Sequence, residues 1–158
     1  MIVALHYEDG PIRELIHELK YGKITELAEI LAPWLAATWE RDGVACDSFV
    51  AIPLHGKRAA ERGFNQAELL ALGACRKLDL LYRSVLVRTR ATESQTGLMR
   101  PARQANMYRA FRTKRAVVGL TCIVVDDVAT TGATLEEAAR ALKDAGARRV
   151  WGLVVARG

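Results

Sequence analysis

Hydrophobic residues recur at helical spacing through the first quarter of the chain. Residues 11–20 place an apolar side chain every three or four positions, and Pro11 suits a first helical turn. Residues 24–40 repeat this spacing, and Pro33 within them predicts a kink or a division into two helices. Because we recognise no strand pattern here, we expect residues 1–43 to form a helical layer beside a sheet that starts later.

Apolar runs and helical segments alternate over the rest of the chain, residues 44–158. Near-continuous apolar strands alternating with helices are typical of a parallel sheet that is covered on both faces. The sequence therefore predicts one α/β domain over residues 1–158, with ligands bound beyond the carboxyl ends of its strands. The expected strands are residues 48–54, 80–89, 121–126 and 149–156, and the expected helices in this part are 65–77 and 134–145.

The stretch CIVVDDVATTGAT, Cys122–Thr134, carries the strongest chemical signal. An apolar run ends in Asp126 and Asp127, and a turn of small and hydroxyl residues then opens a helix. The N–H groups and the macrodipole at the start of such a helix favour an anion. Two carboxylates would repel that anion, so they suit hydroxyl groups or a hydrated cation beside it. A ribose 5-phosphate, which has a phosphate next to a diol, satisfies both halves.

Other interpretations of this stretch explain less of it. A strand that ends in solvated acids before an ordinary glycine turn does not require three threonines. A Walker-type nucleotide site requires a G-x-x-x-x-G-K-[ST] loop, and the chain contains neither that loop nor a Rossmann fingerprint.

Two other segments are basic. Lys57, Arg58 and Arg62 follow the first expected strand, where a pyrophosphate would lie if the two acids hold the ribose. The alternative is a solvated loop that opens a helix, with Asn65 as the helix cap. The second segment has eight basic residues and one acid, Glu93, and such a run is usually a solvated face. Its basic residues are Arg88, Arg90, Arg100, Arg103, Arg109, Arg112, Lys114 and Arg115.

Composition narrows the class of protein. The net charge of +5 suits polyanionic ligands but is weak evidence for nucleic acid on its own. Three widely spaced cysteines form no C-x-x-C pair and favour reduced thiols over a disulfide framework. No apolar run approaches the roughly 18 residues of a membrane span, and the first ten residues do not resemble a signal peptide. We therefore expect a cytoplasmic protein without a membrane span.

The segment VVDDVATTGAT resembles the phosphoribosyl pyrophosphate (PRPP) motif of type I phosphoribosyltransferases. Three other segments resemble the ComF/GntX branch of phosphoribosyltransferase-like proteins: the opening from Tyr7 to Tyr21, the RGFNQ segment within residues 52–71, and pieces of residues 95–111. The resemblance covers about residues 7–157. Members often carry a four-cysteine zinc-binding segment before this opening. This sequence begins without it, so no zinc is predicted, and we expect a shortened branch, a fragment or a misplaced start.

The resemblance implies a type I phosphoribosyltransferase fold with a basic hood loop over residues 90–115. It implies that PRPP binds with Mg²⁺, which is held through the substrate rather than by direct protein ligands. Asp126 and Asp127 would accept hydrogen bonds from the ribose hydroxyls, directly or through Mg²⁺ waters, and Arg62 would assist catalysis. The 5-phosphate would contact Ala129, Thr130, Thr131, Gly132, Ala133 and Thr134, and the pyrophosphate would contact Lys57, Arg58, Arg62, Arg100 and Arg103.

The implied activity is transfer of a 5-phosphoribosyl group to a nitrogen acceptor with release of pyrophosphate; whether catalysis occurs is left open. Some purine phosphoribosyltransferases have a carboxylate where Thr130 stands, so a purine acceptor is disfavoured and the acceptor is unidentified. The ComF resemblance also implies a role in DNA uptake during competence. The alternative function is a non-catalytic module that senses PRPP or a nucleotide, or that binds single-stranded DNA, with competence proteins as further partners.

Overall fold

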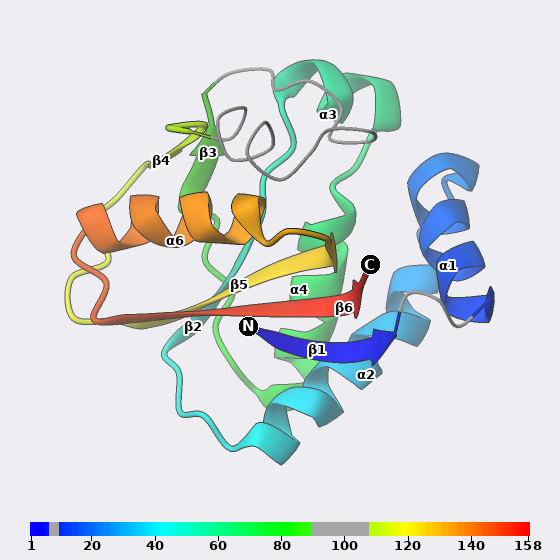
Figure 1. The fold of residues 1–158 in the computed structure, drawn as a ribbon, viewed down its shortest axis with the longest axis horizontal. Coiled ribbons are helices and arrows are strands. Elements are labelled where there is room, and N and C mark those ends of the chain that lie inside the picture. The colour runs from blue at the N-terminus through cyan, green and yellow to red at the C-terminus, as the bar shows by residue number, and fades with distance from the viewer. Residues whose placement is uncertain (7–9, 90–107) are drawn as a thin grey trace.

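A parallel four-stranded sheet forms the centre of the protein (Figure 1). The computed structural model describes residues 1–6, 10–89 and 108–158. The strand order is β1-β6-β5-β2, and each neighbouring pair is parallel. The predicted parallel α/β fold is therefore confirmed. The four strands are β1 (Ile2–His6), β2 (Ser48–Ala51), β5 (Thr121–Ala129) and β6 (Arg149–Arg157).

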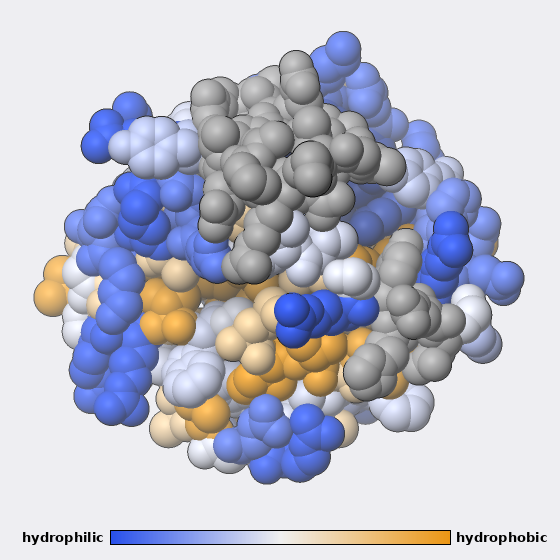
Figure 2. All heavy atoms as spheres, viewed as in Figure 1, coloured by the Kyte–Doolittle hydropathy of each residue, from blue (hydrophilic) through white to orange (hydrophobic). Residues whose placement is uncertain are grey.

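Helices cover both faces of this sheet, as Figure 1 shows. Helix α6 (Ala133–Asp144) packs on β5 and β6 from one side, while α2 (Leu27–Asp42) and α4 (Gln66–Leu78) pack from the other. The middle of β5 and the end of β6 are fully buried, which explains why both strands read as continuous apolar runs. The α6 side is covered less completely: hydrophobic side chains show at the surface over β1 and β6 in Figure 2.

Three further helices of the described residues lie around the sheet. Helix α1 (Gly10–His17) continues directly into the π-helical turn η1 (Glu18–Gly22). Figure 1 shows α1 beside the carboxyl ends of the parallel strands. The short helix α3 (Gly56–Arg62) follows β2, so the chain after the first expected strand is helical rather than an open loop.

The N-terminal part is not wholly helical, which corrects our expectation for residues 1–43. Residues 2–6 form β1, which pairs with β6 at the edge of the sheet: Ile2 lies opposite Leu153 and Leu5 opposite Ala156. The apolar run IVAL is too short to show a period of its own, and it becomes a strand because the edge of β6 offers backbone partners.

The second expected strand, residues 80–89, is also corrected. Tyr82 forms a single parallel bridge with Phe49, after which the Val85 N–H donates to the Arg83 carbonyl at 3.0 Å and turns the chain away. Only β3 (Leu86–Arg88) is a strand, and it pairs antiparallel with β4 (Phe111–Thr113) in a separate two-stranded sheet.

Helix α2 is not divided at Pro33. Its buried stripe, which includes Leu31, Leu35 and Trp39, packs against the sheet side, and that burial outweighs the one backbone hydrogen bond that proline removes. The helix also approaches α4 closely: a Cβ atom built on Gly73 would lie 2.6 Å from the Ala32 Cβ atom. Glycine at residue 73 is what allows this contact.

Candidate functional site

Both acids of the central motif lie inside strand β5, which continues to Ala129 rather than ending at residue 126 as expected. Successive side chains of a strand point to opposite faces. Asp126 accordingly faces the side of α6, while Asp127 faces the opposite side, where Lys20 lies. The two neighbouring carboxylates therefore have different surroundings.

A small hollow, open to solvent, lies between the end of β5 and the start of α6. Gly132 precedes the helix with φ +83°, a left-handed conformation that favours glycine, and α6 begins at Ala133. The Ala133 N–H donates to the Thr131 hydroxyl at 3.4 Å, so Thr131 supports the turn. Asp126 forms one wall of the hollow, whose lining also includes Val128, Ala129, Thr130, Gly132, Ala133, Thr134 and Leu135. Five of the six residues predicted to hold the 5-phosphate therefore line one hollow, and Thr131 is the exception.

The environment of Asp126 favours its neutral form. Burial, followed by the charge of Asp127, raises the pKa of Asp126 to about 7, while Lys20 and Arg88 act in the opposite direction. The Asp126 Oδ1 atom accepts from the Asp127 N–H at 2.9 Å. A carboxyl group with this pKa changes its charge near neutral pH, which suits a group that binds hydroxyls or a cation.

Asp127 is held by a nearly buried ion pair. The Lys20 Nζ atom lies 2.9 Å from Asp127 Oδ1, and the side chains are 21% and 5% exposed. The same Oδ1 atom accepts from the Val128 N–H at 2.6 Å. Burial alone would lower the pKa of Lys20, but Asp127 and Asp126 together raise it. Among the described residues, the Asp127 Oδ2 atom has no hydrogen-bond partner although it is buried.

Arg88 on β3 lies near Asp126, and Arg58 on α3 lies near Arg88. Burial and the charge of Arg58 lower the pKa of Arg88, while Asp126 acts on it in the opposite direction, so Arg88 lies within electrostatic reach of both. Arg58 and Lys57 are exposed on α3. The sequence predicts that the loop after Arg88 meets the loop after Asp126, but it places Arg88 itself only in a general basic run.

Arg62 has structural partners. Its Nη1 atom donates to Gln66 Oε1 at 2.6 Å, and its guanidinium lies 5.5 Å from the centre of the Tyr21 ring. Asn65 caps α4, since its Oδ1 atom accepts from the Ala67 N–H at 3.1 Å. The helix-cap alternative is therefore confirmed for Asn65, whereas a catalytic role for Arg62 stays a prediction.

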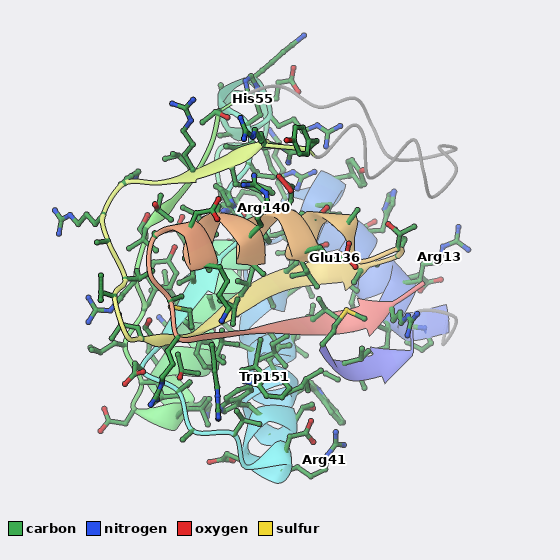
Figure 3. The ribbon with its side chains drawn as sticks, turned by 60° about the vertical axis from the view of Figure 1, so that its left-hand side comes forward. Arg13, Arg41, His55, Glu136, Arg140 and Trp151 are labelled. Atoms are coloured by element: carbon green, nitrogen blue, oxygen red, sulfur yellow. The ribbon has the colours of Figure 1, made fainter. Side chains whose placement is uncertain are left out.

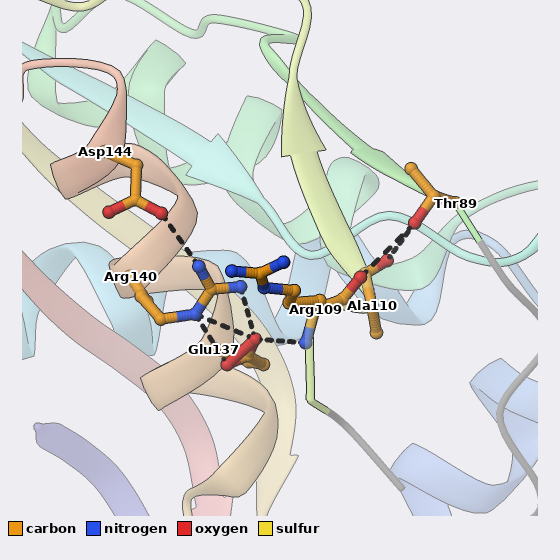
Figure 4. Close-up of polar contacts among 6 residues, drawn as sticks. All are labelled: Thr89, Arg109, Ala110, Glu137, Arg140 and Asp144. Carbon is orange, nitrogen blue, oxygen red and sulfur yellow. Dashed lines mark hydrogen bonds and ion pairs between the residues drawn. The ribbon is translucent and has the colours of Figure 1, made fainter.

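A polar cluster joins α6 to the segment that enters β4 (Figure 4). Glu137 accepts from the backbone N–H of Arg109, and its carboxylate also accepts from Arg140 Nε at 2.9 Å. Arg140 further donates to Asp144 at 2.7 Å. Figure 3 shows Arg140 projecting from α6 on the side of β4. This cluster lowers the pKa of Glu137, chiefly through the Arg140 hydrogen bonds. The cluster was not predicted from the sequence.

The predicted hood loop, residues 90–115, is described only from residue 108 onward. Its last part is not a loop, because Phe111–Thr113 forms β4. Arg100 and Arg103 lie outside the described residues, so their predicted contacts with pyrophosphate stay predictions.

The described residues contain no group of three or more His, Cys, Asp or Glu side chains placed to hold a metal ion. In residues 1–6, 10–89 and 108–158, no helix is both long and apolar enough to cross a membrane.

Residues 65–157 match the family model of the phosphoribosyl transferase domain. DNA utilization protein YhgH of Escherichia coli is 38% identical over 149 residues, which are 89% of this chain and 66% of that protein. Competence protein F of Haemophilus influenzae is 34% identical over an alignment that covers 97% of this chain and 71% of that protein. Competence protein ComFC of Bacillus subtilis is 39% identical over 97 residues, 61% of this chain and 38% of its own. This chain thus spans about two thirds of the first two relatives.

Solved structures agree on the fold. An allosteric regulatory enzyme of purine biosynthesis superposes with a TM-score of 0.53 at 18% identity, over 81% of this chain and 26% of that one. TT1426 from Thermus thermophilus superposes with a TM-score of 0.51 at 17% identity, over 83% of each chain. The fold is that of a phosphoribosyltransferase domain. The chain belongs to this family, and within it to the ComF-type proteins.

Proposed function

We propose that this protein binds PRPP and transfers its 5-phosphoribosyl group to a nitrogen acceptor, with release of pyrophosphate. The observation that carries the proposal is the hollow at the end of β5, where a carboxylate wall from Asp126 meets the first turn of α6. The start of α6 suits a phosphate, and the Asp126 carboxylate suits hydroxyl groups. A ribose 5-phosphate carries both kinds of group. The names of the relatives support a setting in which the protein serves DNA uptake.

The 5-phosphate would lie against the turn before α6. The first N–H groups of a helix have no partner within the helix and carry its positive end. Those of Ala133, Thr134 and Leu135 belong to residues that line the hollow, although the Ala133 N–H is already shared with the Thr131 hydroxyl. The Thr130 and Thr134 hydroxyls would supply additional donors.

The ribose hydroxyls would be held by the acid pair from the two faces of β5. Asp126 would accept from the side of the hollow, and Asp127 would accept through Oδ2, the buried oxygen that has no hydrogen-bond partner among the described residues. Ligand binding would satisfy that oxygen, whose exclusion from water is otherwise costly.

Mg²⁺ fits this donor set only as an ion carried by the substrate. The hollow has one carboxylate in its wall, and the described residues form no three-acid cluster, so the pyrophosphate and hydroxyl oxygens would supply most ligands. When bound, Mg²⁺ would neutralise charge on the pyrophosphate.

The leaving group would be stabilised by the cations beside Asp126. In the reaction, the bond from C1 of the ribose to the pyrophosphate oxygen breaks with its electron pair on that oxygen, a bond from C1 to the acceptor nitrogen forms, and that nitrogen loses a proton to water. Arg88, with Arg58 and Lys57 from α3, would neutralise the departing charge, so catalysis would come from positioning and electrostatics. Thr130 supplies no carboxylate to take the proton, which favours an acceptor that is nucleophilic without a protein base.

The test is calorimetric titration with PRPP and Mg²⁺, followed by an assay of pyrophosphate release with a panel of nitrogen acceptors. We expect Asp126→Asn to weaken PRPP binding at least tenfold and to abolish pyrophosphate release. Asp42→Asn is the matched control, since Asp42 pairs with Arg41, which Figure 3 places at the end of α2, far from α3. PRPP binding that is absent in the wild type, or equal in both variants, would contradict the proposal.

A second function, binding of single-stranded DNA, is favoured by the surface around Tyr108. This exposed ring has the guanidinium carbons of Arg109 and Arg140 within 5.5 and 6.0 Å of its centre. Aromatic rings flanked by cations are platforms on which bases stack. The exposed basic residues that follow along the chain are Arg112, Lys114 and Arg115.

Fluorescence anisotropy with a labelled oligothymidine checks this second function. We expect affinity to fall steeply between about 50 and 200 mM salt, and Tyr108→Ala to weaken binding more than tenfold. Trp34→Ala removes another exposed aromatic ring, on α2, and should leave affinity unchanged. Equal affinities in the two variants would rule out the Tyr108 surface.

A further inference from the structure

The acid pair depends on a residue outside the phosphoribosyltransferase motif. We propose that Lys20 is a positioning residue of this site: it fixes Asp127 from behind β5 so that Oδ2 remains available to the ligand. The inference rests on the proposed function for its ligand, but its structural basis is independent of any ligand.

The first step of the argument is the division of the Asp127 carboxylate. Within the described residues, the contacts of this side chain with Lys20 Nζ at 2.9 Å and with the Val128 N–H at 2.6 Å are both made to Oδ1. The other oxygen, Oδ2, is buried without a partner among the described residues. Because the Lys20 ammonium group and the Val128 N–H both contact Oδ1, they fix the rotation of the carboxylate. The ion pair therefore determines where the second oxygen lies.

The second step is the geometry of the turn that carries Lys20. Residues 18–22 form a π-helical turn, and such turns inside helices occur frequently at functional sites. Leu19 is fully buried and fixes the turn against the core. Lys20 can therefore reach β5 from a rigid support rather than from a flexible loop.

The third step is that the same turn also contacts α3, the helix that carries Lys57 and Arg58. Tyr21 lies under the Arg62 guanidinium at 5.5 Å, and Lys23, just after the turn, donates to the Glu61 carbonyl at 3.2 Å. The turn thus contacts both the acid strand and the cationic helix. Through this turn, the position of Asp127, which would accept from the ribose hydroxyls, is linked to the position of the cations that would hold the pyrophosphate.

The first readout is ligand binding. We expect Lys20→Met to weaken binding of PRPP with Mg²⁺ at least tenfold by calorimetry, because Asp127 loses both its counter-charge and its orientation. Lys20→Arg keeps the charge and should bind within about threefold of the wild type. Lys77→Met, an exposed lysine on α4, is the matched control and should bind as the wild type does. If Lys20→Met does not fold, Lys20→Gln is used in its place in both measurements, because glutamine keeps a hydrogen-bond donor without the charge.

The second readout needs no ligand. Hydrogen exchange measured by mass spectrometry over residues 122–134 should be faster in Lys20→Met than in Lys77→Met, because the Val128 N–H bonds to the oxygen that Lys20 fixes. Exchange and affinity that are both unchanged in Lys20→Met would overturn the positioning role. Faster exchange in Lys20→Met, together with a wild type that does not bind PRPP, would overturn the proposed function and leave the positioning role standing.

Discussion

On the α6 face of β5, Asp126 lines a hollow whose other walls come from one short stretch of the chain, residues 128–135 without Thr131. On the opposite face, Asp127 is held by Lys20, which comes from the N-terminal part of the chain. One face is thus a local structure that the motif builds from itself, and the other depends on tertiary contacts. Two adjacent carboxylates with the same chemistry consequently differ in charge partner, in access and in what a mutation would do to them.

The largest effect should come from breaking the buried pair. Lys20→Met leaves the Asp127 carboxylate without its counter-charge, and we expect a loss of about 3 kcal/mol in the free energy of unfolding, the low end for buried pairs because Lys20 is partly exposed. Urea unfolding of the single variants and of the double variant Lys20→Met/Asp127→Asn measures this.

Removal of both charges should recover most of that stability, because the double variant has no unpaired carboxylate to bury. A double variant as unstable as Lys20→Met would show that the lost stability comes from side-chain packing and not from the ion pair.

The next largest effect should come from Asp126, on the α6 face of β5, and concerns how stability depends on pH. The pKa of Asp126 is raised to about 7 in the folded protein, from an ordinary value of 3.8, so the folded state binds the extra proton. The contribution of Asp126 to stability is therefore greatest at acidic pH and is lost as pH rises from about 4 to about 7. Asp126→Asn should remove this loss and stabilise the protein at pH 8, by less than the roughly 4 kcal/mol that the whole pKa change represents. Thermal unfolding at pH 5 and pH 8 checks it, and an unchanged pH dependence in the variant would contradict it.

A smaller effect tests how tightly the face opposite α6 is packed. Gly73→Ala would place a methyl group 2.6 Å from the Ala32 Cβ atom, so α2 and α4 must move apart. Overpacking costs about 1–3 kcal/mol, and the better helix propensity of alanine returns up to about 1 kcal/mol, so we expect a net loss of about 1 kcal/mol. Chemical denaturation measures it, and a stabilised variant would show that the two helices separate easily.

The smallest effect should come from the exposed end of α6. Asp144→Ala removes only the i,i+4 contact with Arg140, which leaves the Glu137 contacts intact. We expect a loss of about 0.3–0.5 kcal/mol that disappears in high salt. Thermal unfolding at low and high salt measures it, and a loss of more than 1 kcal/mol would show that Asp144 is needed to hold the Glu137–Arg140 cluster in place.

The α6 face could be predicted from the sequence because its residues are contiguous. The turn from Thr130 to Thr134 carries its own signals, and the apolar run of β5 identifies it as a central strand. Features made by pairing between distant segments could not be predicted. The run at residues 2–5 becomes a strand only beside β6, and nothing in residues 80–89 reveals the tight turn at Ser84 that sends β3 to β4. The ion pair of Lys20 with Asp127 and the electrostatic influence of Arg88 on Asp126 arise in the same way.

The π-helical turn at residues 18–22 has a consequence for how this chain could vary in length. A π turn bonds residue i to residue i+5 instead of i+4, so it holds one more residue than an α turn. Deletion of one residue there would convert the turn to an ordinary α-helix and rotate the residues after it by about 100°. Lys20 and Tyr21 would then point away from Asp127 and Arg62. Relatives that bind the same ligand should therefore tolerate substitutions in this turn more readily than single-residue insertions or deletions.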